Sequence, residues 1–524
     1  MSDLTQKEVL TTEIVLKNFA TNLKEDLSEI YRVKPDPIAT TLSNYFIGTR
    51  LASSWRESEL IALRDALIRE KPSILVALET DLGVSAPEAE IIEFLPLIQE
   101  LNYLIDNHRK WFQQSLNASI VDYTMVISDG AKVVNLPVGN TLILGGLGNE
   151  LTTIIRPLIY SMAAGNYNIV VPESFRASDK STTLWTTLEY IIDQTMSKER
   201  VAIVKAEAEW HAMIDKRQVQ IVVDARREGS HEIARKNCAG QDIKYISHGR
   251  DLNIAIVDKH ANLAEAAKAI GAHKFFKAGQ DYNNLDVIHV HEDVHEEFIN
   301  ELKNVLFWHR GNRGPMKFQH GKILDEETFN ELNLMIESKD PKNGQQVTSH
   351  FSNKKNLQIN PVLYLNPDSH SKVMSGKNYS PVAPLVTFND MGELLDSLSK
   401  KEVANNLYFF TGKRYIFEEA KTLISARNLF YNSTSFYLKS CRTPNFVSSW
   451  VVGASLKGIS GFHTFTRQKV ITWSNSERLS FANSRYPITS ETFALASRHR
   501  WINRLTKPRL LAAITALAGA YFVL

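Results

Sequence analysis

The feature that most constrains the fold is a strand–helix–strand pattern. A loop and an apolar strand occupy Asn135–Leu144, and Gly145–Asn149 follows as a turn. A helical pattern over Leu151–Ala164 then leads to a second apolar strand, Asn168–Val171. Two such strands joined by a helix form a β-α-β unit, in which the strands run parallel. Further strands and helices alternate downstream in the same way, so the sequence predicts an α/β protein built on a parallel sheet.

The composition is that of an ordinary globular protein, and it excludes several classes. The chain has 524 residues, 44% of them hydrophobic and 23% charged, which is enough for two or three domains. A net charge of +2 leaves no basic excess to neutralise phosphates, so no nucleic-acid partner is expected. Two cysteines, Cys238 and Cys441, make no disulfide framework, which favours a reducing, cytosol-facing location. The charged N-terminus has no apolar core and is not a signal peptide.

Residues 1–45 predict a helical N-terminal extension. Apolar residues recur there near helical spacing until Pro35 and Pro37 interrupt the pattern. We interpret the segment as a packing arm or a loosely ordered leader, with partner binding as the alternative. Between Trp55 and Phe112 the helical pattern is strong, and it predicts helices that build one wall of the fold.

A second strong feature is the segment Lys274–His291, an apolar helix followed by Gly279-Gln280-Asp281-Tyr282 and a strand. Its frame resembles the nucleophile segment of the aldehyde dehydrogenases, where Gly-Gln-x-Cys carries the reactive cysteine. The resemblance covers about residues 50–485, and the opening helices are similar to those of the class 3, fatty aldehyde branch. The β-α-β unit keeps further residues of the family pattern: Pro137, Gly139, Asn149, Ala163-Ala164-Gly165-Asn166 and Pro172.

The resemblance implies an aldehyde dehydrogenase-like α/β fold. It has a Rossmann-type cofactor domain, an α/β catalytic domain and a small β bridging or oligomerisation element. The expected divisions are the extension 1–45, the Rossmann-type domain 46–247, the catalytic-like domain 248–440, a return to the cofactor domain with the bridging segment 441–497, and a basic stretch with a hydrophobic tail 498–524.

At the reactive positions implied by the family pattern, two of the three side chains differ. Tyr282 stands at the nucleophile, and His248 stands at the general base, as counted back from Val257-Asp258. A histidine titrates near neutrality and could replace a carboxylate base, but without a thioester it has nothing to hydrolyse. Asn149 matches the residue whose amide stabilises the oxyanion, although we favour its explanation as a helix N-cap.

The positions that contact the cofactor in the family also differ. Val171 replaces the lysine that grips the adenosine ribose, and Lys377 replaces the glutamate that binds the nicotinamide ribose. An ammonium has only donors, so it cannot imitate that carboxylate. The phosphate-binding turn lacks its early glycine and carries Asp224 and Glu228, for which Arg226 and Arg227 could partly compensate through ion pairs. Glu173 could accept from a ribose hydroxyl, although we expect it to be solvated. We therefore expect no bound cofactor, and NAD or NADP if the chain is active.

Other candidates for chemistry are weaker. Cys238 and Cys441 have basic neighbours in the sequence, but a displaced nucleophile would need the oxyanion donors to move with it. The run of His289, His291 and His295 suggests a metal site at first sight. It lacks the cysteine or carboxylate partners that commonly complete a zinc site, so we interpret it as a strand end and helix start and predict no metal.

The C-terminal residues predict a membrane anchor. Five basic residues and no acid lie between Arg498 and Arg509, and fifteen uncharged, mostly apolar residues follow over Leu510–Leu524. A spanning helix usually needs about 17–25 residues, so this one is short. The basic cluster favours a cytosolic side, on the endoplasmic reticulum or the mitochondrial outer membrane. The fatty aldehyde branch is similar in carrying such a tail; a buried helix or one that pairs with another subunit is the alternative.

Three functions are open from these observations. The first is a membrane-tethered, catalytically inactive aldehyde dehydrogenase-like protein that acts as a scaffold, partner or ligand-binding homologue. The second is an active NAD(P)-dependent fatty aldehyde dehydrogenase with a rearranged site that oxidises aldehydes to carboxylic acids. The third is a silent subunit in a hetero-oligomer with an active paralogue. The expected assembly is a homodimer or such a hetero-oligomer.

Overall fold

The computed structural model of the protein describes most of the chain between Ser53 and Ser474. The described ranges are 53–115, 129–173, 181–205, 207–226, 230–248, 252–309, 321–374, 379–400, 403–434, 444, 446–449 and 454–474. The predictions for the N-terminal extension, Lys377, Cys441 and the C-terminal tail lie outside these ranges. The chain divides into two compact units, Met1–His108 with Pro137–Phe465 and Arg109–Leu136 with Thr466–Leu524.

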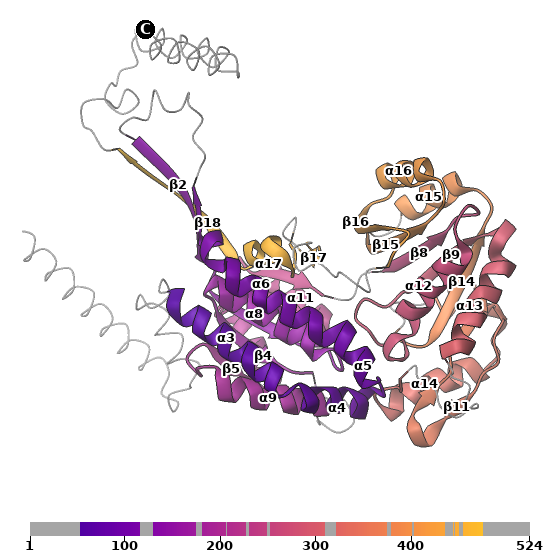
Figure 1. Ribbon diagram of the computed structural model, residues 1–524, viewed down its shortest axis with the longest axis horizontal. Coiled ribbons are helices and arrows are strands. Elements are labelled where there is room, and N and C mark those ends of the chain that lie inside the picture. Colours follow the sequence, from indigo (N-terminus) through magenta and orange to yellow (C-terminus); the bar gives the residue numbers. More distant parts are fainter. Residues whose placement is uncertain are drawn as a thin grey trace, which may run out of the picture. The chain divides into compact units, whose positions relative to one another are not determined.

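The first unit contains a six-stranded sheet that grows from the β-α-β unit (Figure 1). Its order is β17 (Ser448–Ser449), β7 (Lys244–Ser247), β6 (Ile221–Asp224), β3 (Asn140–Leu144), β4 (Tyr167–Val171) and β5 (Val201–Ile203). All neighbours are parallel except β17 and β7. The chain adds β4 and β5 on one side of β3 and then β6 and β7 on its other side, which is the doubly wound order. In such sheets ligands bind where the order reverses, here beyond the carboxyl ends of β3 and β6.

The helices of this part of the first unit follow the expected alternation. The first group precedes the sheet: α3 (Ser53–Arg69), α4 (Lys71–Leu82), α5 (Ala86–Ala89), a π-helical turn η2 (Glu90–Phe94) and α6 (Leu95–Phe112). The second group connects its strands: a π-helical turn η3 (Leu151–Ile155), α8 (Arg156–Ala164), α9 (Thr183–Thr195), α10 (Glu207–Asp215) and α11 (Ser230–Cys238). The two π-helical turns contact each other, and such turns often accompany functional sites.

The first unit also contains a seven-stranded sheet, parallel except for its first pair. Its order is β10 (Gln345–Gln346), β13 (Val362–Leu365), β14 (Val382–Phe388), β9 (Val287–His291), β8 (Asn253–Val257), β15 (Ala404–Phe410) and β16 (Ala426–Tyr431). The remaining helices and turns are α12 (Leu263–Phe275), η4 (Phe276–Gly279), η5 (Glu292–Val294), α13 (His295–His309), α14 (Glu326–Glu337), η6 (Pro341–Asn343), η7 (Lys354–Asn356), α15 (Met391–Ser399), α16 (Arg414–Leu423) and α17 (Gly458–Thr464). A small hairpin joins β11 (Ser352–Asn353) to β12 (Gln358–Ile359).

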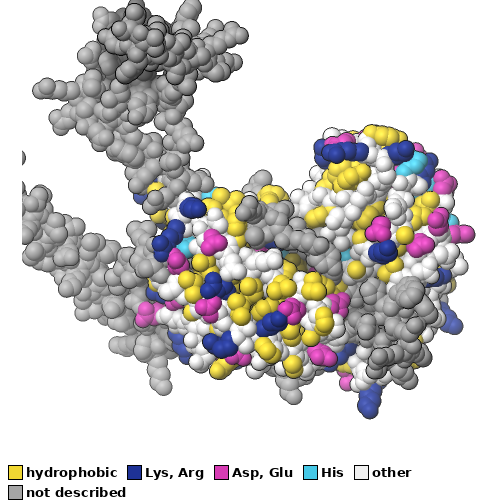
Figure 2. Space-filling view, viewed as in Figure 1, with side chains coloured by type: hydrophobic (Ala, Val, Ile, Leu, Met, Phe, Trp, Pro, Cys, Tyr) yellow, Lys and Arg dark blue, Asp and Glu magenta, His cyan; other side chains and the backbone are white. Residues whose placement is uncertain are grey.

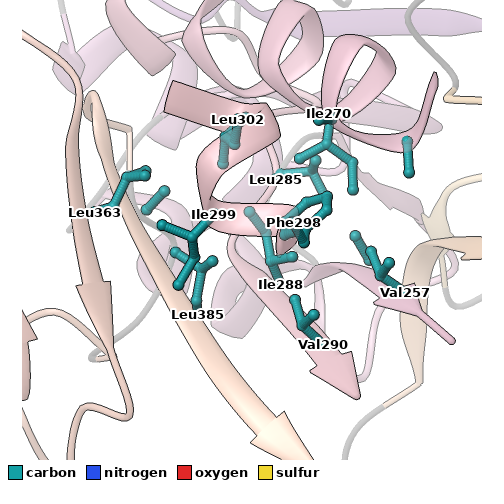
Figure 3. Close-up of a cluster of buried hydrophobic side chains, with 14 of the residues drawn as sticks. Val257, Ile270, Leu285, Ile288, Val290, Phe298, Ile299, Leu302, Leu363 and Leu385 are labelled. Atoms are coloured by element: carbon teal, nitrogen blue, oxygen red, sulfur yellow. The ribbon is translucent and has the colours of Figure 1, made fainter. Parts of the chain in front are cut away.

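The core of the second sheet fixes the position of the reactive segment. Side chains of α12 and α13 pack on those of β8, β9 and β14 (Figure 3). Phe298 is fully buried at the centre of this cluster, beside Ile288 and Leu285. Burial of one such side chain contributes about 1.5–3 kcal/mol. The segment between α12 and β9, which carries Tyr282, is therefore anchored at both ends by well-packed elements.

The second unit is a three-stranded sheet in the order β1 (Gln113–Ser115), β2 (Asp129–Pro137) and β18 (Thr466–Ser474). β1 and β2 are antiparallel. β2 and β18 are the long strands labelled in Figure 1. Residues 116–128, which connect β1 to β2 in the sequence, lie outside the described ranges.

The elements differ from the expected bounds in small ways. The expected helix Leu151–Ala164 opens with the π-helical turn η3 before α8 begins at Arg156. Strand β6 begins at Ile221, later than the expected start at Gln218. Before the strand, the Gln218 carbonyl accepts from Asn140 Nδ2 and the Gln220 side-chain oxygen accepts from the Asn140 N–H.

On the face of the molecule in Figure 2, acidic and basic side chains are interspersed, so the described residues there form no extended patch of one charge.

Candidate functional site

The reactive segment keeps its architecture through an unusual backbone. Lys277, Ala278 and Gly279 all have positive φ, of 53°, 53° and 74°. Non-glycine residues rarely adopt this conformation, so the surrounding bonds must hold it. Gln280 supplies several of them: its Nε2 donates to the carbonyl oxygens of Lys277 (2.9 Å) and Lys322 (2.8 Å), and its Oε1 accepts from the backbone of Leu324 (3.0 Å). The Gly-Gln frame therefore has a structural role.

A buried ammonium occupies the centre of the site. Lys277 is only 1% exposed. Its Nζ forms an ion pair with Glu93 of η2, donates to Asn149 Oδ1 at 2.9 Å and donates to the Gly148 carbonyl at 3.1 Å. Burial raises the pKa of Glu93, and the charge of Lys277 works against that rise. Sequence reasoning assigned no role to Lys277 or Glu93, and the only signal was a lysine within an apolar run.

The side chain of Asn149 is occupied by protein groups. Its Nδ2 donates to the Gln280 carbonyl at 3.0 Å, while its Oδ1 accepts from Lys277. The favoured explanation of Asn149 as a side-chain N-cap is wrong: Glu150 is the residue before η3, and Asn149 contributes only its carbonyl, which accepts from Thr153. The reason is that the amide meets better partners across the site. The predicted oxyanion position is thus next to the reactive segment, with its amide engaged.

The structure brings the predicted nucleophile and base positions into contact. The rings of His248 and Tyr282 lie 4.6 Å apart, tilted by 46°. The Tyr282 hydroxyl accepts a hydrogen bond from Arg156 Nη1 at 3.2 Å. Burial raises the pKa of Tyr282 to about 12, so its phenol stays protonated at neutral pH. His248 follows β7, is buried, and donates its backbone N–H to the Asp224 carbonyl at 2.8 Å.

A second group of buried charges lies behind Tyr282. Glu100 of α6 accepts from Arg156 Nε at 3.1 and 3.2 Å, and Lys457 Nζ lies 3.5 Å from the same carboxylate. Burial alone lowers the pKa of Arg156, but Glu100 and Tyr282 raise it above its ordinary value. Arg156 is therefore a permanent cation beside Tyr282. It is a site residue that sequence reasoning missed, because only the fold brings α8 to the reactive segment.

The carboxyl end of the first sheet, where the resemblance predicts the cofactor, carries buried and paired polar side chains. Leu144 at the end of β3 pairs with Asp224 at the end of β6, so the crevice where the strand order reverses contains a carboxylate. Asp224 is fully buried, forms a forked ion pair with Arg226 (both contacts 3.1 Å), and accepts from Tyr245 at 3.2 Å. Of the arginines expected to compensate the acids of this turn, Arg226 forms an ion pair with Asp224, and Arg227 lies outside the described residues.

The ribose-binding position offers no replacement. Val171 is buried at the end of β4. Glu173, expected to be solvated, is partly exposed and also accepts from the Leu147 N–H at 2.8 Å, because the turn after β3 brings that donor within reach. A carboxylate at the phosphate turn and an aliphatic side chain at the ribose position do not fit an anionic dinucleotide.

The cysteine and the histidines that the sequence offered as further candidates form neither a reactive thiol nor a metal site among the described residues. Cys238 is buried, and burial raises the pKa of its thiol to about 12, which keeps it unreactive. His291 Nδ1 accepts from the Asp293 N–H at 3.2 Å, and His295 bonds the Glu292 carbonyl. Among the described residues no group of three metal-ligating side chains is found. The same residues contain no helix long and apolar enough to cross a membrane.

The fold and the Gly-Gln segment together define an α/β protein of aldehyde dehydrogenase type. The chain belongs to the aldehyde dehydrogenase family, whose model matches residues 49–469. Family 3 is among its distant relatives: aldehyde dehydrogenase family 3 member A2 of Rattus norvegicus is 21% identical over 475 residues, 89% of this chain and 94% of the relative.

Two further comparisons agree with this assignment. The chain is 23% identical to the 4,4'-diapolycopene-4,4'-dial dehydrogenase of Cytobacillus firmus over 356 residues, 68% of this chain and 76% of the relative. A solved structure of Staphylococcus aureus AldH in a substrate-bound state has a TM-score of 0.77 at 20% identity, and the match covers 90% of this chain and 99% of that one. The predicted fold class is therefore confirmed.

Proposed function

We propose that this protein is a catalytically inactive member of the aldehyde dehydrogenase family that binds a ligand or partner. The observation that carries the proposal is the state of the reactive segment: the Asn149 amide is engaged by Gln280 and Lys277. A tetrahedral intermediate needs donors aimed at its oxyanion, and a donor already bonded inside the protein supplies none.

The side chains at the reactive positions support the same proposal. A phenol whose pKa is about 12 is a poor nucleophile at neutral pH, and Tyr282 is also held by Arg156. An active nucleophile needs a lowered pKa or an adjacent base. His248 packs on the Tyr282 ring, so an imidazole in ring contact with a phenol stands where the family pattern has a carboxylate base and a thiol.

We expect the purified full chain to oxidise decanal with neither NAD nor NADP. The measurement is nucleotide reduction by absorbance, with an active aldehyde dehydrogenase as the positive control. Calorimetry with NAD and NADP should give no saturable heat, because Asp224 and Val171 replace the groups that would hold the phosphates and ribose. Turnover that disappears in Cys238→Ser or Cys441→Ser would overturn the proposal and favour the rearranged active site.

We further propose that the protein is tethered to a membrane by Leu510–Leu524 and faces the cytosol. The full chain should stay with membranes after carbonate extraction, and a chain without residues 509–524 should move to the soluble fraction. Leu517→Asp keeps the length but should release the protein, since a central Asp costs about 2.5–3.5 kcal/mol in a spanning helix. Thr515→Ser is the matched control and should stay bound. Carbonate-resistant association of the truncated chain would contradict the tether.

A further inference from the structure

Arg156 carries donors that no described group accepts. A guanidinium has five N–H groups. The Nε–H is shared between the two oxygens of Glu100, and one Nη1–H bonds the Tyr282 hydroxyl. Within the described part of the chain, the second Nη1–H and both N–H groups of Nη2 have no acceptor. The side chain is 12% exposed, and its Nη2 is not among the fully buried polar atoms that lack a partner, so this nitrogen is accessible from outside the protein.

Tyr282 adds a donor next to this edge. Its oxygen accepts from Arg156, which leaves its own O–H proton to bond elsewhere. The pKa of about 12 keeps this proton in place at neutral pH. The ring is held against His248, so the hydroxyl has a defined position. Arg156 and Tyr282 thus present an ordered set of donors.

The charged side chains around this pair are of both signs. Glu100 is fully buried and faces two cations, Arg156 at 3.1 Å and Lys457 at 3.5 Å. Lys277 is neutralised by Glu93. Asp281, beside Tyr282, is an opposing charge, but it is partly exposed and its Oδ1 accepts from the Asn283 N–H at 2.8 Å. Recognition of an anion therefore depends on the open edge of Arg156 and the Tyr282 hydroxyl and not on a net charge.

We propose that Arg156 and Tyr282 form a receptor for a ligand carboxylate, with the free Nη1 and Nη2 edge donating to its two oxygens and the phenol donating to one of them. The planar fork of a guanidinium matches a carboxylate in bidentate fashion. A carboxylate brings one negative charge into this partly buried place, whereas a phosphate brings nearly two and costs more to desolvate. The receptor rests on the proposed function, since it names the class of ligand that a catalytically inactive site would bind.

Titration calorimetry on the full chain tests the receptor with three probes. Octanoate should bind with saturable heat, octanamide should not, and inorganic phosphate should bind more weakly than octanoate. Arg156→Gln should weaken octanoate binding by about tenfold or more, because bonds to a charged group are lost. Tyr282→Phe should weaken it by about threefold to tenfold and retain the ring on His248. Arg200→Gln, which removes an arginine paired with Glu59 elsewhere in the first unit, is the matched control and should bind normally.

Two outcomes would overturn the receptor. One is that octanamide or phosphate binds as tightly as octanoate. The other is that Tyr282→Phe binds octanoate with unchanged affinity. The second result tests the receptor even if Arg156→Gln does not fold. These failures differ from failure of the proposed function. Aldehyde turnover would defeat the proposed function and leave octanoate binding standing, whereas absence of octanoate binding would defeat only the receptor.

Discussion

Replacing Lys277 with Met is expected to lower the free energy of unfolding by about 3–5 kcal/mol, because it leaves the Glu93 carboxylate buried without its cation. Asn149 Oδ1 and the Gly148 carbonyl lose their donor in the same change. Urea denaturation of the full chain measures the loss. Lys268→Met is the matched control: its partner Glu265 is exposed, so its urea midpoint should stay close to that of the native protein.

The double variant Lys277→Met/Glu93→Met distinguishes the interaction between the two charges from the effect of each substitution by itself. Removal of both charges should restore most of the lost stability, since apolar replacement of a buried pair is often neutral. A double variant as unstable as the two single losses added together would contradict a direct interaction between Lys277 and Glu93.

Acidification should reduce the deficit of Lys277→Met. Burial raises the pKa of Glu93 in the folded state, and the change removes the cation that opposes this rise. The folded variant then binds more protons than the unfolded chain between the unfolded and folded pKa of Glu93. Its stability therefore rises as the pH falls through the folded pKa and is lowest above it. A deficit relative to the native protein that stays constant between about pH 8 and about pH 5 would argue against Glu93 as the unpaired group.

Gly279→Ala is the second change with a large expected effect. Gly279 has φ +74°, and an added Cβ would overlap the Ser380 carbonyl and approach Pro381 N at 3.1 Å. The left-handed conformation costs about 1–2 kcal/mol for a residue with a side chain, and the overlap adds about 1–3 kcal/mol or more because the obstacle is backbone. We expect a total loss of about 2–5 kcal/mol or more, measured by thermal or urea unfolding.

Gly240→Ala isolates the contribution of the overlap. Gly240 has nearly the same φ, +77°, but nothing lies within 4 Å of an added Cβ. Its cost should therefore be only the conformational one, about 1–2 kcal/mol. Equal losses in the two variants would show that packing against Ser380 contributes nothing, and would contradict the structural role assigned to the Gly-Gln frame.

Sequence reasoning identified the fold because strand and helix periodicity is local information. The β-α-β unit appears with bounds close to those expected, β3 over Asn140–Leu144 and β4 over Tyr167–Val171. The missing cysteine at Tyr282 and the altered base position at His248 could also be recognised from the family pattern. The order of the strands, which places Asp224 next to Leu144 at the crevice, needed the tertiary structure.

The roles of individual polar residues were harder to predict. Asn149 was interpreted as an N-cap because a helix follows it, yet its amide bonds Gln280, 131 residues away. Glu173 was interpreted as solvated because it follows a strand, yet it accepts from Leu147. In both cases a polar side chain bonds whichever partner the fold brings near, and a local pattern carries no information about that partner.

The sequence by itself determined the α/β fold, the family and the loss of the reactive cysteine, because these depend on periodicity and on residue identity at counted positions. Only the tertiary structure decided which partners the side chains of the reactive segment contact. Lys277 meets Asn149 across 128 residues, and Arg156 meets Tyr282 across 126. Buried charges gain their energy from partners at short range, and distance in space is set by the packing of the whole domain.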